Sequence, residues 1–248
     1  MGELQLEVIQ HRLLREHSLD LSTGAPKVAY REMPTRAAVA EGKHIKQTGG
    51  HGQYGHVILQ IEPLPKGHFD AMEPGEADPQ MIEFENGLKG NDIPRQFVPA
   101  IEDGARAAAG AGILAGYPTI RMRVRLLGGS AHEVDSSEAA FSAAAGLAMR
   151  KALRQAAPAI LEPIMRIEVL VPAAYVGDVL ADLQRRRASI EGIDERGVLK
   201  VVWGKVPLAE MFGYASTLRS LTQGRGSESM EPQDFEPAPP AVQRALVE

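Results

Sequence analysis

The chain of 248 residues has no cysteine, a single tryptophan and an aromatic content of only 5%. Without cysteine it can form neither disulfide bonds nor thiolate metal sites. It also has no uninterrupted apolar run long enough to span a bilayer. Its first residues, MGELQLEVIQHR, lack the basic start and apolar core of a signal peptide. We therefore expect a cytoplasmic protein that does not enter a membrane.

The residues that are present have the composition of an ordinary globular protein. Hydrophobic residues make up 44%, charged residues 24%, and the formal net charge is −5. This acidic average argues against a simple nucleic-acid coat, although a local basic face is compatible with it. The length allows one large or two small domains.

The first two thirds of the chain predict a mixed α/β domain. Residues 3–17 have helical spacing and a short extended stretch follows them, which is too little for a domain, so we expect a continuation of a larger protein. Strands are expected at residues 27–35, 39–47, 56–64 and 120–127, and helices at residues 101–115 and 135–155. Asp135 is expected to be the N-cap of the last helix, with Glu138 completing a capping box.

The last third predicts a second domain. Residues 165–235 have the order strand, helix, two strands, helix and a weak final strand, which is the β-α-β-β-α-β ferredoxin-like arrangement. The tail beyond Pro232 is rich in proline and acidic residues, so we expect it to be poorly ordered or held only by a neighbouring surface.

Residues 46–56 read KQTGGHGQYGH and contain the spacing G-x-G-x-x-G. A dinucleotide-binding fingerprint requires a helix after the glycines, but a strand pattern follows them here. The partner motifs of a protein kinase and the Walker pattern are absent, so a nucleotide-binding enzyme is the weaker alternative. A β-hairpin tip explains the glycines better. Its polar side chains would suit close approach to a large polar surface such as RNA.

Other candidate residues point to no catalytic chemistry. His51 and His56 have no partner carboxylate in the loop, so a metal site is not expected. His132 has no evident structural purpose just before a predicted helix. The arginines of the strand at residues 120–127 share one face, which usually faces solvent. They are Arg121, Arg123 and Arg125.

Several stretches together resemble one family, the C-terminal half of bacterial elongation factor G. They are GELQLEVIQHRLLRE, KVAYRE, KQTGGHGQYGHV, LAGYPT, HEVDSSEAAF, LEPIMRIEV, GDVLADLQRRR and VPLAEMFGYASTLRSLTQGRGS. They occur in the family's order and cover nearly the whole chain.

The resemblance implies an α+β protein with two domains. Residues 1–23 would be the last helix and strand of the family's third domain. Residues 24–159 would form the elongated fourth domain, which resembles part of a small-subunit ribosomal protein. Residues 160–235 would form the ferredoxin-like fifth domain, and residues 236–248 a tail.

The same resemblance implies a ribosome-binding module of a translational GTPase that promotes tRNA–mRNA movement. We expect a monomer with no catalytic residue, metal or cofactor of its own, while GTP and Mg²⁺ would bind elsewhere in the parent. The implied decoding-site tip consists of Gln47, Thr48, Gly49, Gly50, His51 and His132. The implied contact to the sarcin–ricin loop of the large subunit consists of Arg219, Ser220 and Gln223. Two alternatives stay open: a paralogue acting in ribosome recycling or protection, and a stand-alone RNA-binding domain.

Overall fold

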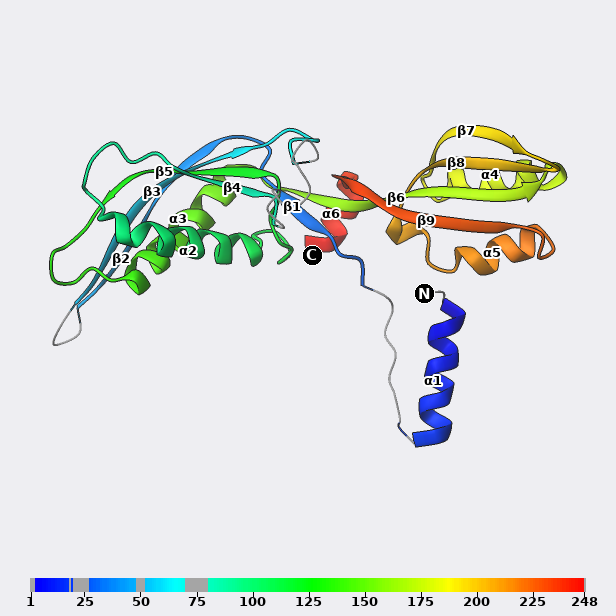
Figure 1. Ribbon diagram of the computed structural model, residues 1–248, viewed down its shortest axis with the longest axis horizontal. Coiled ribbons are helices and arrows are strands. Elements are labelled where there is room, and N and C mark those ends of the chain that lie inside the picture. The colour runs from blue at the N-terminus through cyan, green and yellow to red at the C-terminus, as the bar shows by residue number, and fades with distance from the viewer. Residues whose placement is uncertain (1–2, 18, 20–26, 48–51, 70–79, 248) are drawn as a thin grey trace. The chain divides into compact units, whose positions relative to one another are not determined.

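The computed structural model describes residues 3–17, 19, 27–47, 52–69 and 80–247 (Figure 1). The chain divides into two compact units. The larger unit comprises Tyr30–Leu161 and Glu236–Glu248, and the smaller unit comprises Met1–Ala29 and Glu162–Phe235. Among the described residues, no helix has both the length and the apolar character needed to cross a membrane.

The larger unit is built on a four-stranded sheet with the order β2-β3-β5-β4. Its strands are β2 (Ala38–Lys46), β3 (Gln53–Pro63), β4 (Ile82–Asn86) and β5 (Met122–Ser130). Neighbours are antiparallel except β4 and β5, which are parallel and joined through α2 (Val98–Gly110). Such a parallel pair requires a crossover, and the helix provides it.

One face of this sheet is covered by α2 and by α3 (Glu138–Gln155) (Figure 1). The strands bury alternate residues such as Val57, Leu59 and Ile61 against the helices. Both helices present many buried alanines, whose small side chains allow close approach of backbones. The opposite face carries charged residues such as Glu41 and Lys43 and also exposed apolar ones, Val39 and Ile45.

The smaller unit has the predicted ferredoxin-like order. It contains most of β6 (Ala159–Pro172), α4 (Val176–Arg185), β7 (Ser189–Arg196), β8 (Leu199–Pro207), α5 (Tyr214–Leu221) and most of β9 (Ser227–Pro237). β8 lies between β6 and β7, and β9 pairs with the other edge of β6. The two helices pack on one face of the sheet, where Ile167, Val202, Leu183 and Tyr214 share a core. The α+β class is therefore confirmed, and α1 (Glu3–His17) has the predicted bounds.

The N-cap prediction for α3 is wrong. The helix begins after Ser137, whose backbone is extended and whose side chain accepts a hydrogen bond from the Ala140 N–H. Asp135 lies two residues earlier and has another partner. Both residues are good cap types, and only the backbone path distinguishes them.

Other boundaries also differ from the sequence prediction. The sequence predicts no strand where β4 lies. The helix predicted at residues 101–115 is α2, which both begins and ends a few residues earlier than predicted. Gly213, with a φ of 73°, separates α5 from a short 3-10 turn. Arg121 does not belong to the predicted strand face, because it has a φ of 57° and is buried before β5 begins.

Of the two outcomes expected for the tail, poor order is wrong, because the tail has regular structure and bonds to Ile160. β9 extends to Pro237, and α6 covers Pro240–Val247. The Ala238 N–H donates to the Ile160 carbonyl at 2.9 Å, and the Gln243 side chain joins the same two residues. These contacts link positions far apart in the chain, so local composition could not predict them.

Candidate nucleic-acid interface

Two loops meet at one end of the larger unit. The first tip loop, residues 47–52, joins β2 to β3, where Lys46 pairs with Gln53. The second tip loop, residues 131–137, joins β5 to α3. The Tyr54 N–H donates to the Asp135 carbonyl at 2.8 Å, and the Ser136 hydroxyl donates to the Tyr54 carbonyl at 3.0 Å. These bonds fix the start of β3 against the second tip loop.

Asp135 joins the two loops through its side chain. Its Oδ1 accepts a hydrogen bond from the Gly52 N–H at 2.9 Å. A Cβ atom at Gly52 would lie 3.0 Å from the carboxylate carbon, so a residue with a side chain would crowd this contact. Asp135 therefore holds Gly52, immediately before β3, against the second tip loop instead of capping the helix.

His132 is the exposed side chain of the second tip loop. Its side chain is 55% exposed, and its ring centroid lies 6.1 Å from that of Tyr54. Nδ1 accepts from the Asp135 N–H at 3.2 Å and lies 3.4 Å from the Val134 N. Asp135 Oδ2 is also 3.4 Å away from Nδ1, but the backbone donors occupy this nitrogen. We therefore assign the proton of the neutral ring to Nε2, which leaves a donor for an external partner.

Two of the predicted tip residues, Gln47 and His132, are among the described residues. Gln47 is exposed at the end of β2, and His132 lies at the same end of the unit, beside the start of β3. Thr48, Gly49, Gly50 and His51 lie outside the described residues.

The sequence analysis missed the residues that support this end of the sheet. The Tyr54 hydroxyl lies 2.7 Å from the Ser130 Oγ, which also lies 3.0 Å from Nδ1 of His56. Tyr54 and Ser130 are 76 positions apart, and no local motif signals such a pairing. His56 thus has a structural contact, and the described residues include no cluster of three or more His, Asp or Glu able to hold a metal ion.

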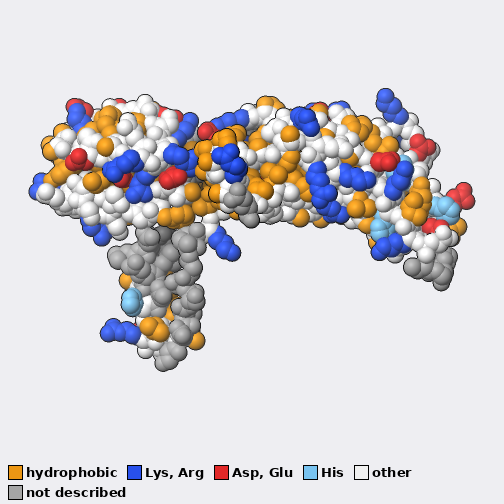
Figure 2. All heavy atoms as spheres, turned by 180° about the vertical axis from the view of Figure 1, so that it is seen from behind, with side chains coloured by type: hydrophobic (Ala, Val, Ile, Leu, Met, Phe, Trp, Pro, Cys, Tyr) orange, Lys and Arg blue, Asp and Glu red, His pale blue; other side chains and the backbone are white. Residues whose placement is uncertain are grey.

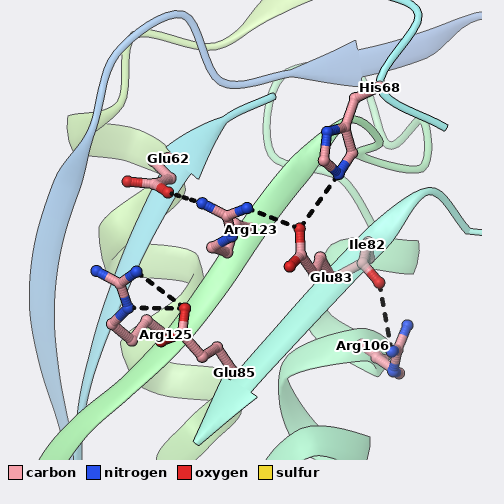
Figure 3. A network of polar contacts seen from close by, with 8 residues as sticks. All are labelled: Glu62, His68, Ile82, Glu83, Glu85, Arg106, Arg123 and Arg125. Carbon is pink, nitrogen blue, oxygen red and sulfur yellow. Dashed lines mark hydrogen bonds and ion pairs between the residues drawn. The ribbon is translucent and has the colours of Figure 1, made fainter. Parts of the chain in front are cut away.

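The arginines of β5 belong to an ion-pair ladder on the open face of the sheet (Figure 3). Arg123 donates to Glu62 of β3 at 2.7 Å and to Glu83 of β4 at 3.0 Å. Arg125 pairs with Glu85 at 2.9 Å. The hydrogen bonds to Glu83 and Glu62 raise the pKa of Arg123, so its charge is held against these carboxylates. Cross-strand pairs of this kind stabilise the sheet and leave little net charge for binding RNA.

The charged side chains do not form one broad basic surface in the view of Figure 2. On the face shown there, lysine and arginine side chains are spread along the larger unit among apolar and polar ones. An interface at the two tip loops would therefore depend on shape and hydrogen bonding more than on a large field of positive charge.

A second candidate surface lies on α5 of the smaller unit. Arg219 and Ser220 are exposed on this helix, and Gln223 follows it with a φ of 54°. The buried Thr222 hydroxyl donates to the Leu218 carbonyl and accepts from the Gly226 N–H at 2.9 Å. This bond fixes the turn that follows the helix and leaves the three predicted residues facing solvent.

Two arginines that follow α4 make contacts within the smaller unit. Arg187 donates to Glu162 at 2.8 Å and to Glu210 at 2.9 Å, and Arg186 lies 5.1 Å from the centre of the Tyr214 ring. Burial, and then the Asp182 carboxylate, raise the pKa of the Tyr214 hydroxyl, which stays neutral. The structure thus assigns Arg186 and Arg187 to contacts that stabilise the fold.

Comparison with known proteins agrees with this architecture. Residues 26–157 match the family model "Elongation factor G, domain IV", and residues 159–246 match "Elongation factor G C-terminus". The chain belongs to the elongation factor G family. The resemblance found in the sequence is thereby confirmed.

Individual relatives match along the full chain. Elongation factor G of Thermotoga neapolitana is 49% identical over 247 residues, and those of Aquifex pyrophilus and Thermotoga maritima are each 48% identical. A crystal structure of a protein from Thermus thermophilus superposes with a TM-score of 0.88 at 41% identity, over 99% of this chain and 35% of the other. The chain spans about a third of the length of these elongation factor G relatives, 34% in each case.

The contact between Gly52 and Asp135 can be tested by substitution. Asp135→Ala should cost about 1 kcal/mol of unfolding free energy and expose the Gly52 N–H to fast hydrogen exchange, because its acceptor is lost. Asp135→Asn should restore most of the protection, since an amide oxygen also accepts. Ser137→Ala is the matched control: it should cost about 1 kcal/mol through the lost helix cap while Gly52 stays protected. Unchanged exchange at Gly52 in Asp135→Ala would show that the contact does not hold the loop.

Proposed function

We propose that this chain is the ribosome-contacting part of a translational GTPase of the elongation factor G type. The two tip loops would enter the decoding site of the small subunit while tRNA and mRNA move. The observation that carries this proposal is the hydrogen bond from the Gly52 N–H to Asp135, three residues after the exposed His132. Membership of the elongation factor G family supports it.

The chemistry of the tip suits RNA. Glycine backbones permit close approach to a polynucleotide, and the Nε2–H of His132 can donate to a phosphate, a ribose oxygen or a base edge. Gln47 adds a side chain that both donates and accepts. The bonds around Asp135 and Ser136 would keep these groups in place, so that little ordering cost is incurred on binding.

The exposed residues of α5 are proposed to contact the sarcin–ricin loop of the large subunit. Arg219 offers a charged fork for a phosphate, while Ser220 and Gln223 offer neutral hydrogen bonds. GTP and Mg²⁺ would bind to a part of the parent factor that this chain does not match. The chain itself is proposed to supply contacts and no proton transfer.

The nucleotide-enzyme alternative has little support in the fold. The first tip loop leads into β3, whereas a dinucleotide site requires a helix whose N-terminus meets the phosphates. A paralogue that acts in ribosome recycling or protection would use the same two surfaces. It would differ in whether binding moves tRNA and mRNA.

Chemical probing of ribosomal RNA with this chain bound tests the proposal. We expect protection at the decoding site of the small subunit and at the sarcin–ricin loop. His132→Ala should weaken only the first protection and Arg219→Ala only the second, because they lie in different units. Each variant serves as the control for the other. Protection at neither site, at concentrations that saturate binding, would refute the proposal.

A further inference from the structure

A pocket lies beside the second tip loop in the larger unit. Its volume is about 560 Å³, within the range of roughly 300–1,000 Å³ typical of small-molecule sites. One wall comes from the segment between β4 and α2, with Asn91, Asp92 and Gln96. The opposite wall contains His132 and Glu133.

The pocket is lined by both apolar and polar residues. The apolar lining residues are Pro94, Phe97 and Ala131, and Phe97 is held by stacking on Phe141 at a centroid distance of 4.8 Å. The polar residues of the two walls are exposed, and four of them make no side-chain hydrogen bond or ion pair with any described residue. These four are Asn91, Asp92, Gln96 and Glu133. These polar groups are therefore available to bind a ligand beside the apolar side chains.

The charges of the lining indicate what the pocket would accept. Asp92 and Glu133 bring two carboxylates, and no lysine or arginine lines the pocket among the described residues. A phosphate group would be repelled by these carboxylates. A ligand with hydrogen-bond donors fits better: the exocyclic amino group of a nucleobase or the hydroxyls of a ribose. The Nε2–H of His132 supplies one donor for a base carbonyl or ring nitrogen.

We propose that this pocket is a nucleoside subsite, which takes the amino-bearing edge of an unpaired base and the hydroxyls of its ribose. The base ring lies on Phe97 and Ala131, and the carboxylates accept from its amino group. The inference rests on the proposed function insofar as the tip loops would bring RNA to the pocket. It goes beyond that function by stating which chemical groups are recognised and which are rejected.

Cytidine and uridine are matched probes, since they have nearly the same shape and only cytidine has an amino group. The ¹⁵N-labelled full chain is titrated with each nucleoside, with cytidine 5′-monophosphate and with 2′-deoxycytidine, and amide shifts are followed by NMR. We expect cytidine to bind with a dissociation constant in the millimolar range and to shift Gln96, Ala131 and His132. Uridine should bind about tenfold more weakly. The 5′-phosphate should not improve binding, and loss of the 2′-hydroxyl should weaken it.

Substitutions test whether cytidine binds in this pocket. Asp92→Asn and Gln96→Ala should each weaken cytidine binding, and both residues are exposed, so the fold should be retained. Asp103→Asn makes the same charge change as Asp92→Asn at an exposed position of α2 outside the pocket, and it should leave binding unchanged. Equal binding of cytidine and uridine, tighter binding of the monophosphate, or no shift at the pocket residues would each overturn the proposal.

The ribosomal probing described above separates this proposal from the proposed function. If the chain protects ribosomal RNA while cytidine leaves the pocket amides unshifted, the subsite is refuted and the ribosomal role stands. If cytidine binds in the pocket while ribosomal RNA stays unprotected, the subsite stands and the ribosomal role is refuted.

Discussion

Replacing Glu32 by alanine should lower the free energy of unfolding by at least about 3 kcal/mol, because several backbone N–H groups would lose their acceptor. Glu32 belongs to β1 (Arg31–Met33), is fully buried, and accepts hydrogen bonds from the backbone N–H groups of the segment 113–117. The shortest come from Ile113 at 2.6 Å and Ala115 at 3.0 Å. Its carboxylate thereby holds a loop more than 80 positions away in the chain.

The backbone of Glu32 also forms hydrogen bonds with the chain just after this loop. Main-chain and side-chain bonds therefore hold the loop against β1 together. Its N–H donates to the Pro118 carbonyl at 2.9 Å, and its carbonyl accepts from the Ile120 N–H at 2.8 Å. Gly112 has a φ of 64°, and a Cβ atom there would meet Glu32 Oε1 at 2.8 Å.

Denaturant unfolding measures this effect. Glu32→Gln keeps one oxygen acceptor and should lose roughly half as much stability as Glu32→Ala. Glu85→Ala is the control, since it removes a carboxylate from a partly exposed ion pair and should cost no more than about 1 kcal/mol. A Glu32→Ala variant within about 1 kcal/mol of the parent would mean that water satisfies the loop N–H groups.

Gly42→Ala is the second substitution with a large expected effect. A Cβ atom at Gly42 of β2 would lie 2.0 Å from the Ala144 carbonyl oxygen and 2.5 Å from the Ala148 nitrogen, both in the backbone of α3. Neither atom can move without shifting the helix from the sheet. We expect a loss of about 3 kcal/mol or more, at the upper end for overpacking.

Gly110→Ala provides the matched control, because nothing lies within 4 Å of the added atom. This residue is the last of α2, where alanine should be neutral or stabilise by up to about 1 kcal/mol. Thermal unfolding of both variants distinguishes crowding from a general effect of removing glycine. Equal melting temperatures for the two would contradict the close contact between α3 and β2.

The sequence predicts the parts of the fold that depend on local pattern. In the smaller unit, strand patterns and two helices predicted at residues 176–187 and 208–221 lead to the ferredoxin-like order that the structure contains. The helix at residues 138–155 is predicted for the same reason, while its first residue is not, because Asp135 and Ser137 are equally suitable caps.

Contacts between distant segments could not be predicted in this way. The bond from Gly52 to Asp135 joins residues 83 positions apart, and Glu32 reaches a loop 81 or more positions away. The arginines of β5 have an alternating pattern in the sequence, but the three carboxylates that neutralise them come from two other strands. For the site, the resemblance implied one tip with Gln47 and His132, but the bonds that Asp135 and Ser136 make to Gly52 and Tyr54 follow only from the fold.

The central claim is that the tip acts on tRNA and mRNA and leaves GTP hydrolysis to the parent factor. The most direct test is a chimera in which this chain replaces the matching third of elongation factor G from Thermotoga maritima. Movement of mRNA and hydrolysis of GTP are then measured on ribosomes in a single turnover. We predict that the chimera moves mRNA, and that His132→Ala slows this movement about tenfold, equivalent to one lost hydrogen bond of roughly 1.4 kcal/mol, while hydrolysis continues at its usual rate. Unchanged movement, or a parallel loss of hydrolysis and movement, would contradict the account.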